Sequence, residues 1–474
     1  MQLKKTKIIA TQWPATAWKE KLKALYDAWA NIIRFNFSHV NYDFFLENIN
    51  AIKQLNESWE TNLSMLLDTK WPEIRTKKTD EVVYLTTWEK FMLTSTSRED
   101  NIDTKGMKLI VCNYEYIVSD LEVWSLVDID SGLLKARVIE KNDWELICEA
   151  LNSHKVTSLR HLNLPWTKVK LPWITESDKK DILFWIENWY DFIALSFVRN
   201  KWNIIELQEF LKENNGQWIK IISKVENGEA LENIDEIIEY SDGIMIARWD
   251  LWVEIPFETL PMVQKTIADK CKQAGKFFIV ATQMLESMIV NPIPTRAEVT
   301  DIFNACMQKA DATMLSWETA AWDYPIEAVR EMKNILKVTE SQIKYKHDYF
   351  SRDLWEDNLK KYFVKNAIYT AEDMWVKAMI VFTHTWFMAK TTAAFRPNLP
   401  VFAFTSSEKV RKKLNIHFWL KNFVIEKKSN EENIESAKKV LLEKWLVRTG
   451  EKILVVYDSH TNDKVIPTIK VIEL

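Results

Sequence analysis

The chain has 474 residues, a formal net charge of −4 and 27% charged residues, with lysine and arginine spread evenly along it. This pattern excludes the concentrated basic surface of a nucleic-acid-binding protein, and apolar runs such as 192–198 are far shorter than the about 20 residues that span a membrane. No apolar stretch long enough for a secretion signal follows the N-terminus, and the four cysteines are widely spaced, so we expect a soluble, cytoplasmic protein with reduced thiols.

The first predicted unit is a barrel. From residue 6 to about residue 340, short β-branched runs alternate with amphipathic helical stretches, which is typical of βα units around a parallel sheet. Eight units of this kind close a (β/α)8 TIM barrel. The eight strands are expected near 7–11, 32–36, 63–67, 191–196, 219–224, 242–247, 277–282 and 311–315.

The alternation of strand-like and helical segments is interrupted at two places. Between 68 and 171, strand-like pieces at 81–86, 108–112 and 136–139 alternate with polar turns, which indicates a small β-barrel domain inserted after the third strand. After residue 340 a separate α/β domain is expected, with helices near 353–374 and 431–444 and strands near 378–383, 400–404 and 452–456. The predicted domains are therefore a barrel from residues 1–70 and 171–345, an inserted β domain at 71–170 and a C-terminal α/β domain at 346–474.

Tryptophan and glycine are out of proportion. The chain contains 23 tryptophans and 7 glycines, whereas average usage predicts roughly 33 glycines. Trp29, Trp189 and Trp445 follow helix-like segments, and Trp166 and Trp173 follow prolines, which are positions that favour glycine. We therefore hypothesise that a UGA codon read as glycine in the source cell is written here as tryptophan.

Polar residues gather at the carboxyl ends of the predicted strands, where barrel enzymes carry their sites. Lys224 and Glu226 are two residues apart and share a face, and Asp250 follows the next strand. The two carboxylates can share a divalent cation such as Mg²⁺. Solvated or salt-bridged carboxylates, with Lys224 as an ion-pair partner, are the open alternative.

A second group of oxygen-bearing residues follows strands two and three. Asn36, Ser38, Asp68 and Thr69 suit a monovalent cation, although capping and turn residues have the same composition. The neighbouring His39 is interpreted as a hydrogen-bonded structural histidine. Cation sites beside a lysine and an arginine favour phosphoryl chemistry, because that reaction depends on positioning and charge neutralisation.

Eight segments in order resemble the motifs of the pyruvate kinase family. They are KTKIIATQWPAT, NIIRFNFSH, LLDTKWPEIRT, IISKVEN, ARWDLWVEIP, ATQMLESM, PTRAEVTDI and MLSWETAAWDYPIEAV. The similarity spans the whole chain and is weakest after about residue 345. The match becomes close to complete when seven tryptophans are read as glycine: Trp13, Trp29, Trp71, Trp249, Trp252, Trp317 and Trp322.

This resemblance implies transfer of the phosphoryl group of phosphoenolpyruvate to ADP, giving ATP and pyruvate. Lys224 would neutralise the transferring group, and Glu226 and Asp250 would hold Mg²⁺ or Mn²⁺. The backbone amides of Trp249 and Asp250 would bind the substrate carboxylate. Thr282 would lie near the methylene carbon of the substrate, within a relay that protonates the enolate. Ser316 and Glu318 would support that relay.

The resemblance also assigns nucleotide and potassium contacts. Arg34 would bind the phosphoryl group from the other side and, together with His39 and Arg75, would contact the nucleotide. The oxygen cluster of strands two and three, Asn36, Ser38, Asp68 and Thr69, would hold K⁺. Glu73 is the residue type of the potassium-dependent branch, in which no lysine replaces the ion. The inserted domain would close over the nucleotide, and the family precedent is a homotetramer.

Several features depart from the family pattern. Val40 stands where the family usually has glycine. Thr383 and Thr385 resemble the start of the sugar-phosphate effector loop, but Phe387 and Met388 replace its polar continuation, so activation by fructose 1,6-bisphosphate is not predicted.

Two alternatives remain at this point. One is a metal-dependent carbon–carbon lyase on the same barrel, which the lysine before Glu226 and the inserted domain disfavour. The other is a catalytically inactive homologue that acts as a binding or scaffold protein, in which every tryptophan is real.

Overall fold

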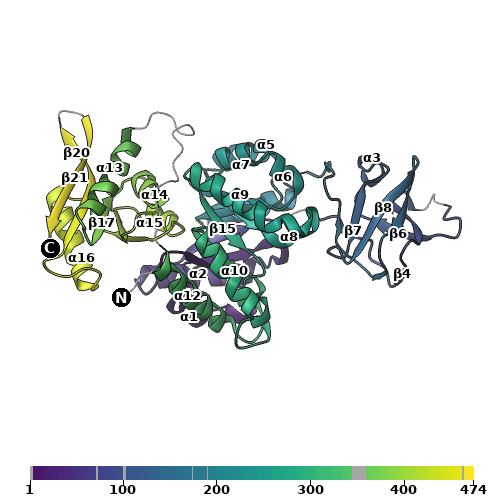
Figure 1. Ribbon diagram of the computed structural model, residues 1–474, viewed down its shortest axis with the longest axis horizontal. Helices are drawn as coiled ribbons and strands as arrows, with labels where there is room; N and C mark the ends of the chain where they lie inside the picture. Colours follow the sequence, from purple (N-terminus) through teal and green to yellow (C-terminus); the bar gives the residue numbers. More distant parts are fainter. Residues whose placement is uncertain are drawn as a thin grey trace.

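The computed structural model describes residues 4–70, 73–99, 103–172, 174–188, 191–343, 359–461 and 464–474. Three bodies lie in a row, with a barrel between the C-terminal domain and the inserted β domain (Figure 1). No helix in these ranges is long and apolar enough to cross a bilayer. The predicted α/β architecture is confirmed.

Eight parallel strands close the barrel in the order β1-β16-β15-β14-β13-β12-β3-β2. Each lies within two residues of its predicted bounds. The strands are β1 (Lys7–Thr11), β2 (Ile32–Asn36), β3 (Ser64–Asp68), β12 (Phe192–Leu195), β13 (Lys220–Val225), β14 (Gly243–Ala247), β15 (Phe277–Ala281) and β16 (Ala312–Leu315).

These strands form because their side chains are buried on both faces. Ile9, Leu66 and Met245 belong to a cluster inside the barrel, whereas Ile8 and Leu67 face the helical layer. A parallel sheet covered on both faces needs nearly continuous apolar runs. This is why the barrel strands could be read from the sequence.

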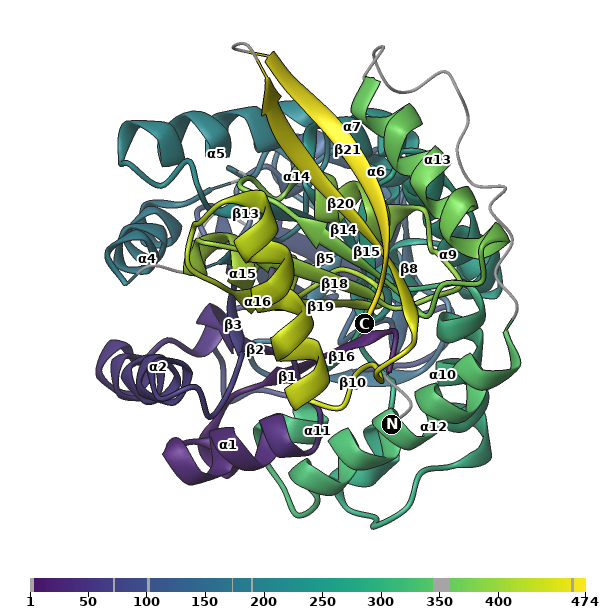
Figure 2. The same ribbon diagram turned by 90° about the vertical axis from the view of Figure 1, so that its left-hand side faces the viewer.

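Helices surround the barrel, as Figure 2 shows with the C-terminal domain in front. The longer ones are α1 (Lys19–Asp27), α2 (Tyr42–Glu57), α4 (Glu176–Glu187), α5 (Lys201–Glu213), α7 (Ile234–Tyr240), α9 (Leu260–Gln273), α10 (Arg296–Met307) and α12 (Pro325–Gln342). Capping boxes begin α4 at Thr175 and α10 at Thr295. Short helices lie at the carboxyl ends of the strands: α6 (Gly228–Glu232), α8 (Arg248–Glu254) and α11 (Trp317–Ala320).

The inserted segment is a six-stranded sheet, order β11-β7-β8-β9-β5-β6, that curls into a half-barrel. Its strands are β5 (Lys90–Ser95), β6 (Lys108–Cys112), β7 (Leu126–Ile129), β8 (Leu134–Lys141), β9 (Leu146–Ala150) and β11 (Leu162–Asn163). A separate pair, β4 (Val83–Leu85) and β10 (His154–Val156), and the short helix α3 (Ile117–Asp120) complete it. We call this unit the β domain.

The C-terminal domain has a five-stranded sheet, order β19-β18-β17-β20-β21. Its elements are α13 (Leu359–Asp373), β17 (Ala378–Phe382), α14 (Phe387–Ala394), β18 (Val401–Thr405), α15 (Glu408–Leu414), β19 (Leu420–Val424), α16 (Asn430–Glu443), β20 (Lys452–Thr461) and β21 (Lys464–Glu473). The sequence predicted five of these and missed α14, α15, β19 and β21. The start of the first predicted helix, residues 353–358, lies outside the described residues.

A buried ion pair joins the C-terminal domain to the amino ends of the barrel strands. Arg396 Nη1 lies 2.8 Å from Asp311 Oδ1, and both residues are fully or almost fully buried. The same carboxylate accepts the backbone N–H groups of Phe278 at 3.1 Å and Phe418 at 3.0 Å. One carboxylate therefore binds the barrel and the C-terminal domain together.

Asp311→Ala is expected to lower the free energy of unfolding by about 3–5 kcal/mol, because it leaves a buried guanidinium without its counterion. Denaturant unfolding followed by fluorescence measures the loss. The control is Asp27→Ala, which removes an exposed pair with Lys23 and should change the free energy of unfolding far less, because solvent screens that pair. Asp311→Ala combined with Arg396→Met should recover part of the stability; equal losses for both aspartate variants would contradict the assignment.

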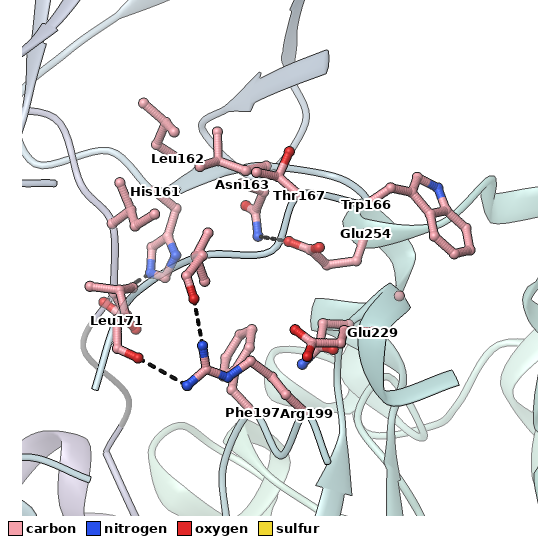
Figure 3. Close-up of a pocket in the computed structure, with 16 residues that line it drawn as sticks. His161, Leu162, Asn163, Trp166, Thr167, Leu171, Phe197, Arg199, Glu229 and Glu254 are labelled. Carbon is pink, nitrogen blue, oxygen red and sulfur yellow. Dashed lines mark hydrogen bonds and ion pairs between the residues drawn. The ribbon is translucent and has the colours of Figure 1, made fainter. Parts of the chain in front are cut away.

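A second contact joins the β domain to α8. Asn163 donates from Nδ2 to Glu254 Oε1 at 3.0 Å (Figure 3). Burial raises the pKa of Glu254 to about 7, despite the opposing hydrogen bond of Asn163. The folded protein thus holds this proton more tightly than the unfolded chain, whose glutamate pKa is about 4.3. Stability is lost as the pH rises from about 4.3 through about 7.

Glu254→Gln is therefore expected to raise the free energy of unfolding by about 1–3 kcal/mol at pH 8 and to change it little at pH 4. The amide keeps an oxygen for Asn163 and carries no buried charge. Unfolding curves at the two pH values measure the difference, with the exposed Glu258→Gln as the control. A gain of the same size at both pH values would show that titration is not the cause.

Candidate active site

A cavity of about 220 Å³ lies at the carboxyl ends of the barrel strands. Seven residues predicted for the site line it: Arg34, Asn36, Trp249, Asp250, Thr282, Ser316 and Glu318. Because the carboxyl ends of parallel strands meet at one mouth of a barrel, residues far apart in the sequence converge here.

A smaller cavity of about 60 Å³, drawn in Figure 3, lies between the β domain and the barrel. Several of its polar side chains are already hydrogen-bonded to the protein. Arg199 donates to the carbonyls of Val169 and Leu171, and Asn163 donates to Glu254. We call it the hinge cavity, because the two segments that connect the β domain to the barrel line it.

Lys224 is the centre of the charged network at the barrel mouth. Its Nζ lies 2.9 Å from Asp68 Oδ1, 2.9 Å from Ser196 Oγ and 2.8 Å from Glu226 Oε1. Burial lowers the pKa of Lys224, but the charges of Asp68, Glu226 and Asp250 outweigh it and raise the pKa above its ordinary value. The ammonium group is therefore held charged in a nearly dry site.

Arg34 is fixed by the same carboxylate. Its Nε donates to Asp68 Oδ2 at 2.7 Å, and its Nη1 donates to Thr11 Oγ1 at 3.0 Å. Burial raises the pKa of Asp68, but Lys224 and Arg34 outweigh it and hold the pKa below its usual range. Asp68 thus sets the spacing of two cations at the mouth.

Glu226 and Asp250 place two further carboxyl groups at the site. Glu226 is fully buried, and its Oε2 accepts the N–H of Phe197 at 2.6 Å. Burial and the neighbouring Glu226 raise the pKa of Asp250 to about 8, although Lys224 lowers it. The donors are carboxylate oxygens, which hard cations prefer. Among the described residues no three His, Cys, Asp or Glu side chains converge on a point, so water and substrate would complete the shell of Mg²⁺.

Thr282 follows β15 in a conformation that β-branched residues rarely adopt, with φ of 67°. Its Oγ1 accepts the N–H of Trp249 at 3.0 Å and donates to the carbonyl of Ala281 at 2.6 Å. The amide of Trp249, expected to bind a carboxylate, therefore already has a partner. Backbone strain of this kind concentrates at functional sites.

Ser316 and Glu318 lie where β16 meets α11. Glu318 is almost fully buried and accepts the N–H groups of Ser316 at 2.7 Å and Leu285 at 3.1 Å. Burial raises the pKa of Glu318 above its ordinary value. The Oγ of Ser316 has no hydrogen-bond partner in the described part of the chain and is available to a ligand.

The predicted potassium residues are adjacent. Asn36 and Asp68 are paired across β2 and β3, and Thr69 Oγ1 accepts the N–H of Ser196 at 3.0 Å. Asn36 also accepts the N–H of the exposed Ser38 at 3.2 Å, as a capping residue does. The capping and ion-binding interpretations therefore apply to the same residues.

Besides Arg34, two residues were predicted to contact the nucleotide, and the structure describes them to different extents. The backbone of His39 ends a 3-10 turn (Phe37–His39), and its side chain lies outside the described part. Arg75 pairs with Glu73 and lies 2.7 Å from His161 Nε2. Glu73 and His161 both line the hinge cavity, so the structure does not bring Arg75 into the lining of the larger one.

Sequence reasoning missed Ser196. Its Oγ donates to the carbonyl of Thr69 at 2.8 Å and lies between Asp68 and Lys224. It directly follows β12, so the rule that polar residues end barrel strands would have found it. The residue is a single serine in an apolar run, and no spacing marked it.

The comparisons with known proteins agree with this geometry. The family model for the pyruvate kinase barrel domain matches residues 3–329, and that for the pyruvate kinase alpha/beta domain matches residues 363–472. The chain is 38% identical over 465 residues to the pyruvate kinase of Clostridium perfringens, covering 96% of each, and 40% identical over 418 residues to that of Sporosarcina psychrophila, covering 87% of this chain and 70% of the relative. A crystal structure of pyruvate kinase from Cryptosporidium parvum superposes with a TM-score of 0.92 at 32% identity, covering 99% of this chain and 96% of that one. With two domain models in order and relatives along its full length, the chain belongs to the pyruvate kinase family of phosphotransferases.

Proposed function

We propose that the 220 Å³ cavity binds phosphoenolpyruvate and that the phosphoryl group of this substrate passes to ADP, giving ATP and pyruvate. The observation that carries the proposal is the buried Lys224 ammonium, held 2.8 Å from Glu226 at the barrel mouth. A fixed cation beside oxygen ligands is what a phosphoryl transition state needs, because its charge is spread over the equatorial oxygens.

Lys224 and Arg34 act on the transferring group from two sides. Both donate to the carboxylate of Asp68, through different oxygens, so neither has to reorganise when charge develops. Preorganised charge of this kind is usually the largest catalytic contribution. Ser196 fixes Lys224 further through its hydroxyl oxygen.

Glu226 and Asp250 are the residues that would hold Mg²⁺ or Mn²⁺. When bound, the ion would supply Lewis-acid stabilisation to the developing enolate. The two carboxylates position it beside Lys224, whose ammonium remains protonated.

Thr282 and Ser316 are proposed to serve the proton transfer that follows. Pyruvate enolate must gain a proton at its methylene carbon, and both side chains line the cavity. Thr282 Oγ1 holds its place through Trp249 and Ala281. The hydroxyl of Ser316 can bind the water that delivers the proton, while Glu318 fixes its backbone.

The remaining assignments rest on the family. His39 and Arg75 would face the nucleotide, K⁺ would lie among Asn36, Ser38, Asp68 and Thr69, and the β domain would close over ADP and exclude water. A cytoplasmic homotetramer is the assembly proposed. The lyase and scaffold alternatives are not favoured, since Lys224, Glu226, Asp250 and Thr282 are all present and the relatives are pyruvate kinases.

Lys224→Met is expected to lower kcat by about 10³-fold or more, because it removes a preorganised charge from the transition state. A lactate dehydrogenase-coupled assay with ADP and phosphoenolpyruvate measures it. Lys23→Met, on the outer helix α1, is the matched control and should retain activity. A Lys224 variant with near-normal kcat would refute the proposed role.

Removal of K⁺ is expected to lower activity strongly, because Glu73 leaves the predicted site without a replacing lysine. The assay is repeated in tetramethylammonium buffer with and without KCl. Glu73→Lys should reduce the dependence on K⁺, whereas Glu81→Lys on the exposed β domain surface should not. Full activity of the unchanged protein without K⁺ would overturn this assignment.

A further inference from the structure

Tryptophan dominates the residues whose backbone lies in the left-handed region. Twenty non-glycine residues have a positive φ in the described part of the chain, and ten of them are tryptophan. The chain has 22 phenylalanines and 13 tyrosines, yet among those described only Phe197 has a positive φ. Bulk and aromaticity therefore do not explain the pattern.

We propose that the native polypeptide carries glycine at these ten positions, because a UGA codon written here as tryptophan is decoded as glycine in the source cell. An L-residue in the left-handed region is strained, whereas glycine is not. The positions are Trp18, Trp29, Trp59, Trp88, Trp124, Trp166, Trp322, Trp375, Trp419 and Trp445.

Three of these ten tryptophans stand directly after the C-terminal end of a helix, at the position where glycine is common. At Trp29 the N–H bonds to the carbonyl of Tyr26 at 2.8 Å, and the next N–H, of Ala30, bonds to Leu25 at 2.9 Å. This pattern of two backbone hydrogen bonds is the Schellman motif, which usually has glycine at its left-handed residue. Trp375 and Trp445 show the same two bonds.

A true glycine of this chain supplies the internal comparison. Gly275 has φ of 62°, its N–H bonds to Lys272 at 3.0 Å, and the N–H of Lys276 bonds to Cys271 at 2.9 Å. The backbone at Trp29, Trp375 and Trp445 is thus built on the same plan as at Gly275.

The ten side chains also lie mostly at the surface. Eight of them are exposed, with Trp375 at 92% and Trp445 at 85%. Trp185 is the opposite case. It is fully buried, donates from Nε1 to the carbonyl of Phe192 at 3.1 Å and makes edge contacts with Phe35 and Phe37. Its backbone φ is not positive, so we assign Trp185 as a true tryptophan.

The backbone sorts some positions differently from the sequence motifs. Trp59 and Trp88 have no glycine counterpart in the family motifs, but their φ values of 61° and 70° place them in the set. The turn predicted at Pro165-Trp166 is matched by φ of 59° at Trp166. Trp71, Trp173, Trp189 and Trp355 lie outside the described residues.

The inference bears on the catalytic cavity, and this step rests on the proposed function. Trp249 and Trp317 line the cavity, and their indoles are half exposed. Neither has a positive φ, so their assignment follows from the family motifs and the shared codon. Glycine there would remove two indoles from the cavity wall and widen the entrance for substrate.

The test is peptide mass spectrometry on the protein purified from its source, together with the codons of its gene. We expect glycine at all ten positions, at Trp249 and at Trp317, with UGA codons there, and tryptophan with UGG at position 185. Tryptophan at the ten positions, at Trp249 or at Trp317 would overturn the proposal.

A second measurement uses three synthetic genes, encoding the chain as written, the chain with the ten tryptophans changed to glycine, and the chain with only Trp185→Gly. We expect the variant with ten substitutions to unfold at a temperature on the order of 10 °C or more above that of the chain as written. The Trp185→Gly variant should unfold at a lower temperature than the chain as written. If the variant with ten substitutions were less stable than the chain as written, the inference would be contradicted. Because both readouts are independent of activity, failure of the proposed function would leave them interpretable.

Discussion

The carboxylate of Asp68 is the contact on which the barrel mouth depends. It accepts from Arg34 on β2, from Lys224 on β13 and from Ser196 after β12. The desolvation free energy of a buried carboxylate is offset only when its oxygens are paired with cations and hydrogen-bonded. Both oxygens of Asp68 are paired in this way. Neighbouring strand ends are thereby held in one arrangement, in which Arg34 and Lys224 keep a fixed spacing and Lys224 also pairs with Glu226.

The other side of the barrel mouth carries the carboxyl groups of Glu226 and Asp250. Lys224 pairs with Glu226, and burial beside Glu226 raises the pKa of Asp250 to about 8. Carboxylates in a low-dielectric cleft attract a metal cation more strongly than solvent-exposed carboxylates do. The electrostatics of the cleft therefore match the chemistry of the pyruvate kinase family.

Backbone conformation supplies a constraint of a different kind. Thr282 and Gln283 have positive φ beside the cavity, as strained residues at functional sites often do. The ten tryptophans in the left-handed region lie mainly at helix ends and turns, and most are exposed. Thr282 lines the cavity, where the proposed function would offset its strain, whereas strain at a solvent-exposed helix end such as Trp375 has no such compensation.

The sequence by itself determined the barrel, because strands buried on both faces must be apolar, and it placed Lys224 and Glu226 together through the two-residue period of a strand. It also located the polar strand ends that form the cavity. Only the tertiary structure placed Arg75 beside His161 and joined Asp311 to Arg396 across 85 positions. These contacts have no local signal, since they depend on which strand ends and domains meet in space. The φ of Trp59 and Trp88 was likewise decided by the folded backbone, which alone shows where a side chain is strained.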